Sequence, residues 1–122
     1  MLTITKTFEF AYAHYLPEYK GKCKNLHGHT GMLEIEICRT KETERLCNYQ
    51  GMIMDFGFLK EIVTQTVLDK LDHQCLNDVL PIIPTAENMT EWTVEQLKTV
   101  LGESLLRVRI YETPTSYAEW RK

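Results

Sequence analysis

Residues 2–40 read LTITKTFEFAYAHYLPEYKGKCKNLHGHTGMLEIEICRT, and two alternating stretches inside this segment decide the fold. Apolar side chains recur at every second position through most of residues 2–12, and residues 30–40 repeat the pattern. Successive side chains of a strand point to opposite faces of a sheet, so each stretch predicts a strand with one buried face. Consecutive strands are usually sheet neighbours, so we expect these two to pair.

Two amphipathic helices are predicted in the middle of the chain. Residues 56–71 place apolar side chains three to four positions apart, and the preceding Asp55 suits a helix N-cap. The second helix has Thr85 at its N-cap, an apolar stripe over residues 89–101 and Gly102 at its end. Both patterns predict helices that bury one face.

The last part of the chain returns to alternation. Residues 104–112 predict a third strand, Pro114 ends it, and residues 117–121 predict a short last strand. The polar residues 41–51 are expected to form a turn and a returning arm. The order ββααββ predicts an α+β fold, with a four-stranded antiparallel sheet and two helices on one face. Residues 1–122 are expected to form a single domain, and the other face of the sheet then needs a cover.

Composition excludes several classes of protein. The 122 residues are 43% hydrophobic and 25% charged, which is ordinary globular usage and argues against disorder. A net charge of −3 without long basic runs argues against nucleic acid as a partner. No apolar run approaches the roughly 18 residues of a membrane helix. The four irregularly spaced cysteines, without an export signal, predict free thiols in a reducing compartment, so we expect a cytoplasmic protein.

Three histidines are the most informative residues. His27 and His29 are two positions apart and would point to the same side of a strand, while His14 closes the first strand. If the two strands pair, three imidazoles converge at one end of the ribbon. Three neutral histidines with a vacant fourth position are the ligand set of a catalytic zinc site. The alternative is a loop with solvated histidines.

Cys23 precedes His27 by four residues and has three interpretations. It is a fourth zinc ligand that closes the site, a thiolate base or nucleophile beside an open metal, or a small buried hydrophobic residue. Lys22 and Lys24 flank it and favour the thiolate, which supports a reactive role. The other three cysteines lack such surroundings and are expected to be packing residues.

Three further positions carry polar groups with two interpretations each. Asp72 and His73 end the first helix, where a histidine is also favoured simply by the helix dipole; the alternative is a catalytic pair that reaches a shared site. Glu112 ends a strand and is either solvated or a pocket carboxylate that accepts two hydrogen bonds from a guanidine-like edge. Thr85 is either a helix cap alone or a helix cap that also lies near a bound ligand.

The chain resembles the pterin synthases of the tunnelling-fold group, 6-pyruvoyltetrahydropterin synthase and its bacterial relative 6-carboxytetrahydropterin synthase. The resemblance runs over almost the whole chain, and MDF favours the bacterial branch. Phe58 departs from the family pattern, because an acidic residue is expected there, and Ala86 stands at a variable position. Neither is a proposed catalytic group. The motifs that carry the resemblance are FEFAYAHYLP (8–17), CKNLHGH (23–29), GMIMDF (51–56), LDHQCLND (71–78), PTAEN (84–88) and YET (111–113).

The resemblance implies a site and an assembly. Subunits of this family associate side by side and close a barrel around a tunnel, commonly as two stacked trimers, so a homo-oligomer, a trimer or a dimer of trimers, is expected. This covers the bare sheet face and lets Asp72 and His73 of one subunit meet Cys23 of another. The implied roles are Zn²⁺ held by His14, His27 and His29, Cys23 as general base with Asp72 and His73 as catalytic partners, and Glu112 and Thr85 as substrate-binding residues for the pterin.

The implied activity is that of a carbon–carbon lyase. 7,8-Dihydroneopterin triphosphate would lose triphosphate and acetaldehyde to give a carboxypterin, a precursor of queuosine and other deazapurines. A pyruvoyl synthase, which stops before the cleavage, is the first alternative. A non-catalytic, zinc-stabilised binding module with Cys23 as fourth ligand is the second. Candidates for contacting the triphosphate are Lys20, Lys22, Lys24 and Arg121.

Overall fold

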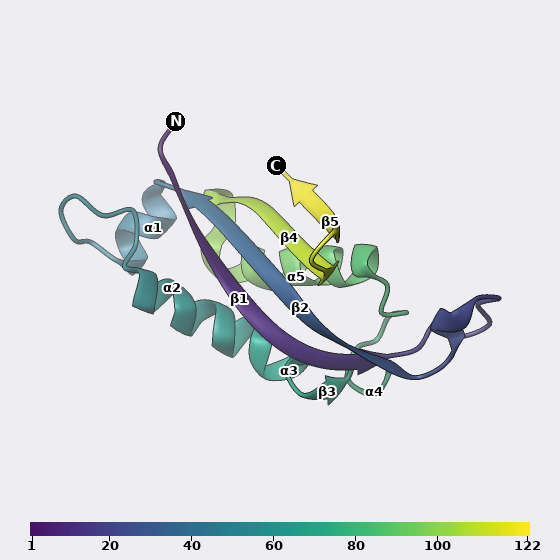
Figure 1. The fold of residues 1–122 in the computed structure, drawn as a ribbon. Coiled ribbons are helices and arrows are strands. Elements are labelled where there is room, and N and C mark those ends of the chain that lie inside the picture. The colour runs from purple at the N-terminus through teal and green to yellow at the C-terminus, as the bar shows by residue number, and fades with distance from the viewer.

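Two long paired strands run the length of the molecule in the computed structural model, which describes residues 1–122 (Figure 1). The loop that joins them projects beyond the helices. The strands are β1 (Thr3–His14), β2 (His27–Cys38), β3 (Gln74–Cys75), β4 (Leu105–Thr113) and β5 (Ser116–Arg121). The helices are α1 (Lys41–Leu46), α2 (Phe56–Val63), α3 (Asp69–Leu71), α4 (Leu76–Val79) and α5 (Ala86–Leu101), with a π-helical segment at Thr64–Leu68 and 3₁₀ turns at Lys22–Lys24 and Gly102–Ser104.

The sheet has five strands in the order β3-β1-β2-β4-β5. β1 and β2 pair antiparallel over their full length, from Thr3 opposite Cys38 to His14 opposite His27. β2–β4 and β4–β5 are also antiparallel, whereas β3 runs parallel to β1. The α+β fold was predicted, but the expectation of a four-stranded, wholly antiparallel sheet was wrong by one strand.

The extra strand arises from a tight turn after α3. His73 has a positive φ of 60°, and its backbone N–H donates to the Ala11 carbonyl at 2.6 Å. The chain is thereby turned onto the outer edge of β1, where Gln74 and Cys75 pair with Tyr12 and Ala13. A strand of two residues is too short to leave a periodic pattern in the sequence.

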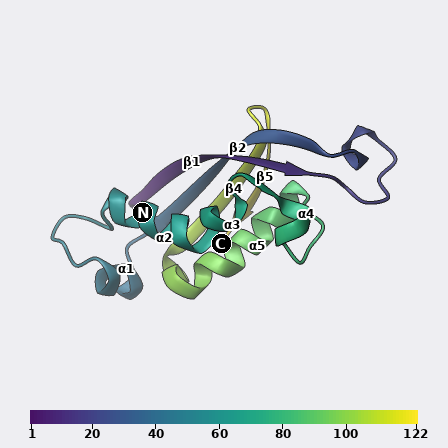
Figure 2. The ribbon, with the colours of Figure 1, turned by 90° about the horizontal axis from the view of Figure 1, so that it is seen from below.

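The helices lie on one face of the sheet, as predicted (Figure 2). The even-numbered side chains of β1 and the odd-numbered side chains of β2 point towards them, because the register places them on the same face. This face and the helix stripes form one core of 24 buried residues. Its centre includes Leu33, Ile35, Leu59, Met89, Leu97 and Ile110.

The predicted caps are present, and the helical segments are more divided than expected. The Asp55 carboxylate accepts from the Phe58 N–H at 2.9 Å, and the Thr85 hydroxyl accepts from the Asn88 N–H at 3.1 Å. The first helix becomes π-helical at Thr64–Leu68 before α3 completes it. The polar residues 41–51 contain α1, which was not predicted because the segment has no apolar stripe.

The face opposite the helices carries a ladder of ion pairs. The Arg107 guanidinium donates to Glu36 at 2.7 Å and to Glu34 at 2.9 Å, and Arg109 donates to Glu119 at 2.7 Å. The Arg107 side chain is only 11% exposed although no helix covers it, because neighbouring side chains on the same face surround it. None of the helices is long and apolar enough to cross a lipid bilayer.

Candidate metal centre and active site

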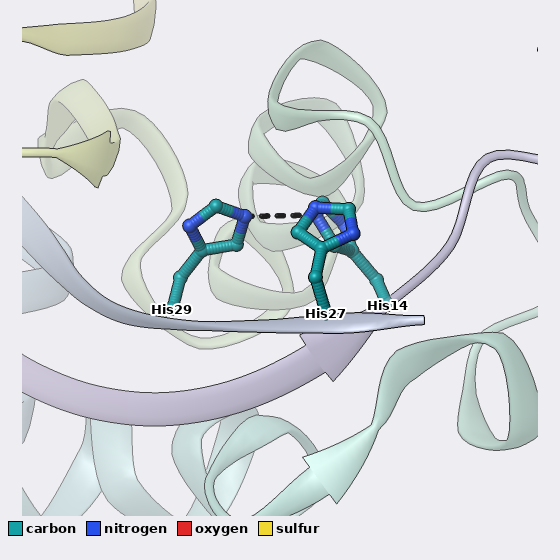
Figure 3. Close-up of side chains that lie close together, drawn as sticks. All are labelled: His14, His27 and His29. Atoms are coloured by element: carbon teal, nitrogen blue, oxygen red, sulfur yellow. Dashed lines mark hydrogen bonds between the residues drawn. The ribbon is translucent and has the colours of Figure 1, made fainter. Parts of the chain in front are cut away.

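The three predicted histidines converge on the helix-facing side of the sheet end. His14 lies directly opposite His27 in the β1–β2 register, and His29 follows two residues later on the same face. Their available ring nitrogens lie within 4.8 Å of one another, and Nε2 of His29 is 3.1 Å from Nε2 of His14. Figure 3 shows the three rings rising from the two strands towards one another. The cluster has the donors and spacing to hold a metal ion.

Backbone carbonyls orient two of these rings. Nδ1 of His14 donates to the Pro84 carbonyl at 2.8 Å, and Nδ1 of His27 donates to the Asn25 carbonyl at 2.7 Å. A carbonyl oxygen can only accept, so Nδ1 carries the proton in both rings and Nε2 is left with its lone pair. Burial, and the neighbouring His14 and His27, lower the pKa of His29, while the Glu112 carboxylate opposes the shift. Neutral imidazoles with free Nε2 atoms are what a metal ion requires.

Glu112 reaches this cluster from β4. Its Oε1 lies 3.4 Å from Nε2 of His14 and 3.7 Å from Nε2 of His29, and its side chain is 31% exposed. A hollow of about 450 Å³ opens beside it between β2 and β4, lined by ten residues that include His29, Gly31 and Tyr111. Glu112 therefore borders both the candidate metal ligands and a hollow whose volume is within the usual range for small-molecule sites.

Asp72 and His73 form a contact pair at the outer edge of β1. Asp72 Oδ1 accepts from the Ala11 N–H at 2.9 Å and lies 3.0 Å from Nδ1 of His73. The Ala11 N–H, with a smaller contribution from His73, lowers the pKa of Asp72. The His73 side chain is 81% exposed and borders a second hollow of about 520 Å³. Although neighbours in a helix need not touch, the left-handed turn at His73 brings these two side chains together.

The strained backbone of His73 predicts a measurable difference between two substitutions. A left-handed φ costs a residue with a Cβ about 1–2 kcal/mol, and glycine escapes that cost. We therefore expect His73→Gly to be more stable than His73→Ala by about 1 kcal/mol, or roughly 4 °C in Tm. Thermal unfolding followed by circular dichroism measures the difference. Equal Tm values for the two variants would contradict strain at this position.

Cys23 is separate from both groups within one chain. It lies in the 3₁₀ turn of the projecting loop, where its carbonyl accepts from the Leu16 N–H at 2.7 Å. Its thiol is free and partly exposed, and it does not belong to the group of candidate metal ligands. Nor does it line the hollow beside His73. A single chain therefore does not bring the predicted base to its predicted partners.

The neighbourhood of Thr85 contributes to the site chiefly through its backbone. The Thr85 hydroxyl caps α5, while the preceding residue supplies the carbonyl that orients His14. Sequence reasoning missed the orienting carbonyls of Pro84 and Asn25, because a backbone acceptor leaves no residue-type signal. It also missed Tyr12, whose ring packs beside two of the histidines, because alternation identifies this residue only as a buried position of a strand.

Comparisons with known proteins give a consistent family. A family model described as 6-pyruvoyl tetrahydropterin synthase matches residues 3–122. A 6-carboxy-5,6,7,8-tetrahydropterin synthase from Haemophilus influenzae is 32% identical over 143 aligned positions and covers 100% of both chains. One from Synechocystis is 38% identical over 123 positions, covering 98% of this chain and 93% of the relative. The structure of Caenorhabditis elegans 6-pyruvoyl tetrahydropterin synthase superposes with a TM-score of 0.82 at 26% identity, covering 99% and 95% of the two chains.

Proposed function

The chain belongs to the 6-pyruvoyl tetrahydropterin synthase family, and we propose that it is a zinc-dependent 6-carboxy-5,6,7,8-tetrahydropterin synthase. Its substrates are 7,8-dihydroneopterin triphosphate and one water, its products are a carboxypterin, acetaldehyde and triphosphate, and its pathway is queuosine biosynthesis. The observation that supports the carboxy activity is the name shared by the Haemophilus and Synechocystis relatives, which match nearly the whole chain.

His14, His27 and His29 hold the metal in this proposal, and their chemistry fits it. Two of the rings are fixed by carbonyls that leave Nε2 free, and the three ligand atoms lie close together. Imidazole is a good zinc ligand, and three of them leave a coordination position open. Bound zinc would act as a Lewis acid towards the hydroxyl oxygens of the substrate side chain.

The chain's own residues supply binding and proton transfer. Glu112 borders the hollow next to the histidines, and its carboxylate accepts hydrogen bonds from the N–H edge of the pterin. Thr85, at the start of α5, assists in holding the ring. Cys23 as thiolate removes a proton from the substrate side chain, and His73, held by Asp72, returns a proton. The fixed contact between Asp72 and His73 at 3.0 Å suits this role.

Association of identical chains completes the site in this proposal. β5 is an edge strand, and β3 pairs with only two residues of β1, so most of the outer edge of β1 also has no partner strand. Unpaired edges invite strand pairing between chains. Pairing of these edges around a ring of three chains would close a barrel, with the ion-pair ladder on its inner face. It would also place Cys23 of one subunit near Asp72 and His73 of another.

A product assay tests the activity. Zinc-loaded protein is incubated anaerobically with dihydroneopterin triphosphate, the aldehyde is trapped, and the products are identified by mass spectrometry. We expect acetaldehyde and a carboxypterin in equal amounts. A pyruvoyl product without aldehyde would instead support the pyruvoyl synthase, the activity named for the Caenorhabditis neighbour. No turnover by folded, zinc-loaded protein would contradict both enzymatic proposals.

A further inference from the structure

The hydroxyl of Tyr12 is the one buried side-chain nitrogen or oxygen atom in the chain without a hydrogen-bond partner. The residue is 4% exposed. Its ring stacks on Phe10 at 5.1 Å and lies 5.3 Å from the His14 ring and 5.4 Å from the His29 ring. A buried hydroxyl without a partner destabilises a fold, and phenylalanine would fill the same space without that cost. We therefore expect the Tyr12 hydroxyl to have a hydrogen-bond partner when metal is bound.

Gly31 shows where the ring of Tyr12 points. A Cβ at Gly31 would lie 2.9 Å from Cε1 of Tyr12 and 3.1 Å from the carbonyl oxygen of Tyr111. The ring therefore lies over Gly31 of β2, at the point where β2 meets Tyr111 of β4, and Glu112 follows Tyr111 in the chain. The pKa of Tyr12 is raised by burial and, to a smaller extent, by the Glu112 carboxylate. The phenol therefore lies within electrostatic reach of Glu112, without a hydrogen bond to it.

Metal binding would leave Glu112 without a hydrogen-bond donor among the histidines. In the metal-free chain its Oε1 faces Nε2 of His14 and Nε2 of His29. These same nitrogens are the candidate metal ligands (Figure 3). A ring nitrogen that ligates a metal cannot donate a hydrogen bond, so neither histidine could donate to the Glu112 carboxylate in a metal-loaded site. The unpaired O–H of Tyr12 is a buried donor, and its ring packs beside the same two histidines.

We propose that Tyr12 is a positioning residue for Glu112. In the metal-loaded site the Tyr12 O–H donates to one carboxylate oxygen of Glu112, which fixes the carboxylate and leaves the other oxygen for the N–H edge of a pterin. Gly31 makes this reach across β2 possible. The inference rests on the proposed function, because it assumes that Glu112 binds the pterin ring.

Binding of unsubstituted pterin to zinc-loaded protein tests the inference, with the dissociation constant measured by fluorescence titration. We expect Tyr12→Phe to bind pterin about tenfold more weakly, which is the scale for loss of one hydrogen bond to a charged group. Its zinc content should be unchanged, and its metal-free Tm should be equal to or higher than that of the parent. Tyr117→Phe is the matched control, because Tyr117 is exposed on β5 and makes no hydrogen bond through its hydroxyl; it should bind pterin like the parent.

A double-mutant cycle separates positioning from packing. If Tyr12 acts through Glu112, Tyr12→Phe should weaken binding no further in a Glu112→Ala background. Unchanged pterin binding by Tyr12→Phe, additive effects in the cycle, or a Tm lowered by several degrees would each overturn the inference while leaving the proposed function intact. Failure of the zinc-loaded parent to bind pterin would refute the pterin-binding role of Glu112, and the inference would fall with it.

Discussion

Replacing His29 with alanine should abolish stoichiometric zinc binding and lower turnover of dihydroneopterin triphosphate by roughly a thousandfold or more. The structure leaves two imidazoles, His14 and His27, in that variant, and two ligands rarely retain zinc against water. Loss of a Lewis acid removes several kcal/mol of stabilisation from the developing negative charge, and each 1.36 kcal/mol is a factor of ten in rate. Zinc content by mass spectrometry of the native protein and the rate of triphosphate release measure the two effects.

His73→Ala is the control for this prediction. It removes the fourth histidine of the chain, which lies at the β1 edge and outside the ligand group. It should therefore keep its zinc while losing turnover. A His29→Ala variant that still carries one zinc per chain would show that the metal is held elsewhere and would remove the basis for the three-histidine site.

The convergence of the histidines could be predicted from the sequence because strand geometry is regular. Once residues around 27–29 are placed on a strand, alternation puts His27 and His29 on one face. Pairing of consecutive strands then puts His14 opposite them, and the observed register does so. No long-range information was needed beyond the pairing of two neighbouring strands.

The contacts that orient the side chains of the site could not be predicted from strand geometry. Two ring orientations depend on the backbone carbonyls of Pro84 and Asn25, and a carbonyl is present at every residue. The contact of Asp72 with His73 depends on a left-handed φ that histidine adopts only when its surroundings impose it. These features follow from tertiary packing, and local periodicity does not record them.

Tyr12 illustrates the same limit within a correctly predicted strand. Its position in the alternation predicts burial, and it is buried. That its ring lies over Gly31 next to Tyr111 depends on the pairing of β2 with β4, and these two residues are 80 positions apart in the chain. A pattern read along one strand cannot distinguish a core tyrosine from one that borders a site.

Mixing two inactive variants should restore activity if the site is shared between subunits. Cys23→Ala and His73→Ala should each lose roughly 10²–10⁴-fold in turnover, the usual range for a general acid or base. Cys23 and His73 are not in contact within one chain, because Cys23 lies in the projecting loop and His73 at the edge of β1. In an equimolar mixture that exchanges subunits freely, a site that takes one residue from each of two chains is complete in roughly a quarter of cases. We therefore expect recovery of about a quarter of parental turnover.

The recovery has a strict control in the double variant Cys23→Ala/His73→Ala. The double variant is mixed with either single variant at the same total protein concentration. No site in these mixtures can contain both the Cys23 thiol and the His73 imidazole, so activity should stay at the level of the single variants. Native mass spectrometry establishes that mixed oligomers have formed in each case. Mixed oligomers without recovery would place the two groups in one chain's site or deny one of them its role. Recovery near a quarter would explain why a single chain keeps the exposed pair of Asp72 and His73, with its strained backbone, at the edge of the sheet. The pair would face a thiol that only a neighbouring copy provides.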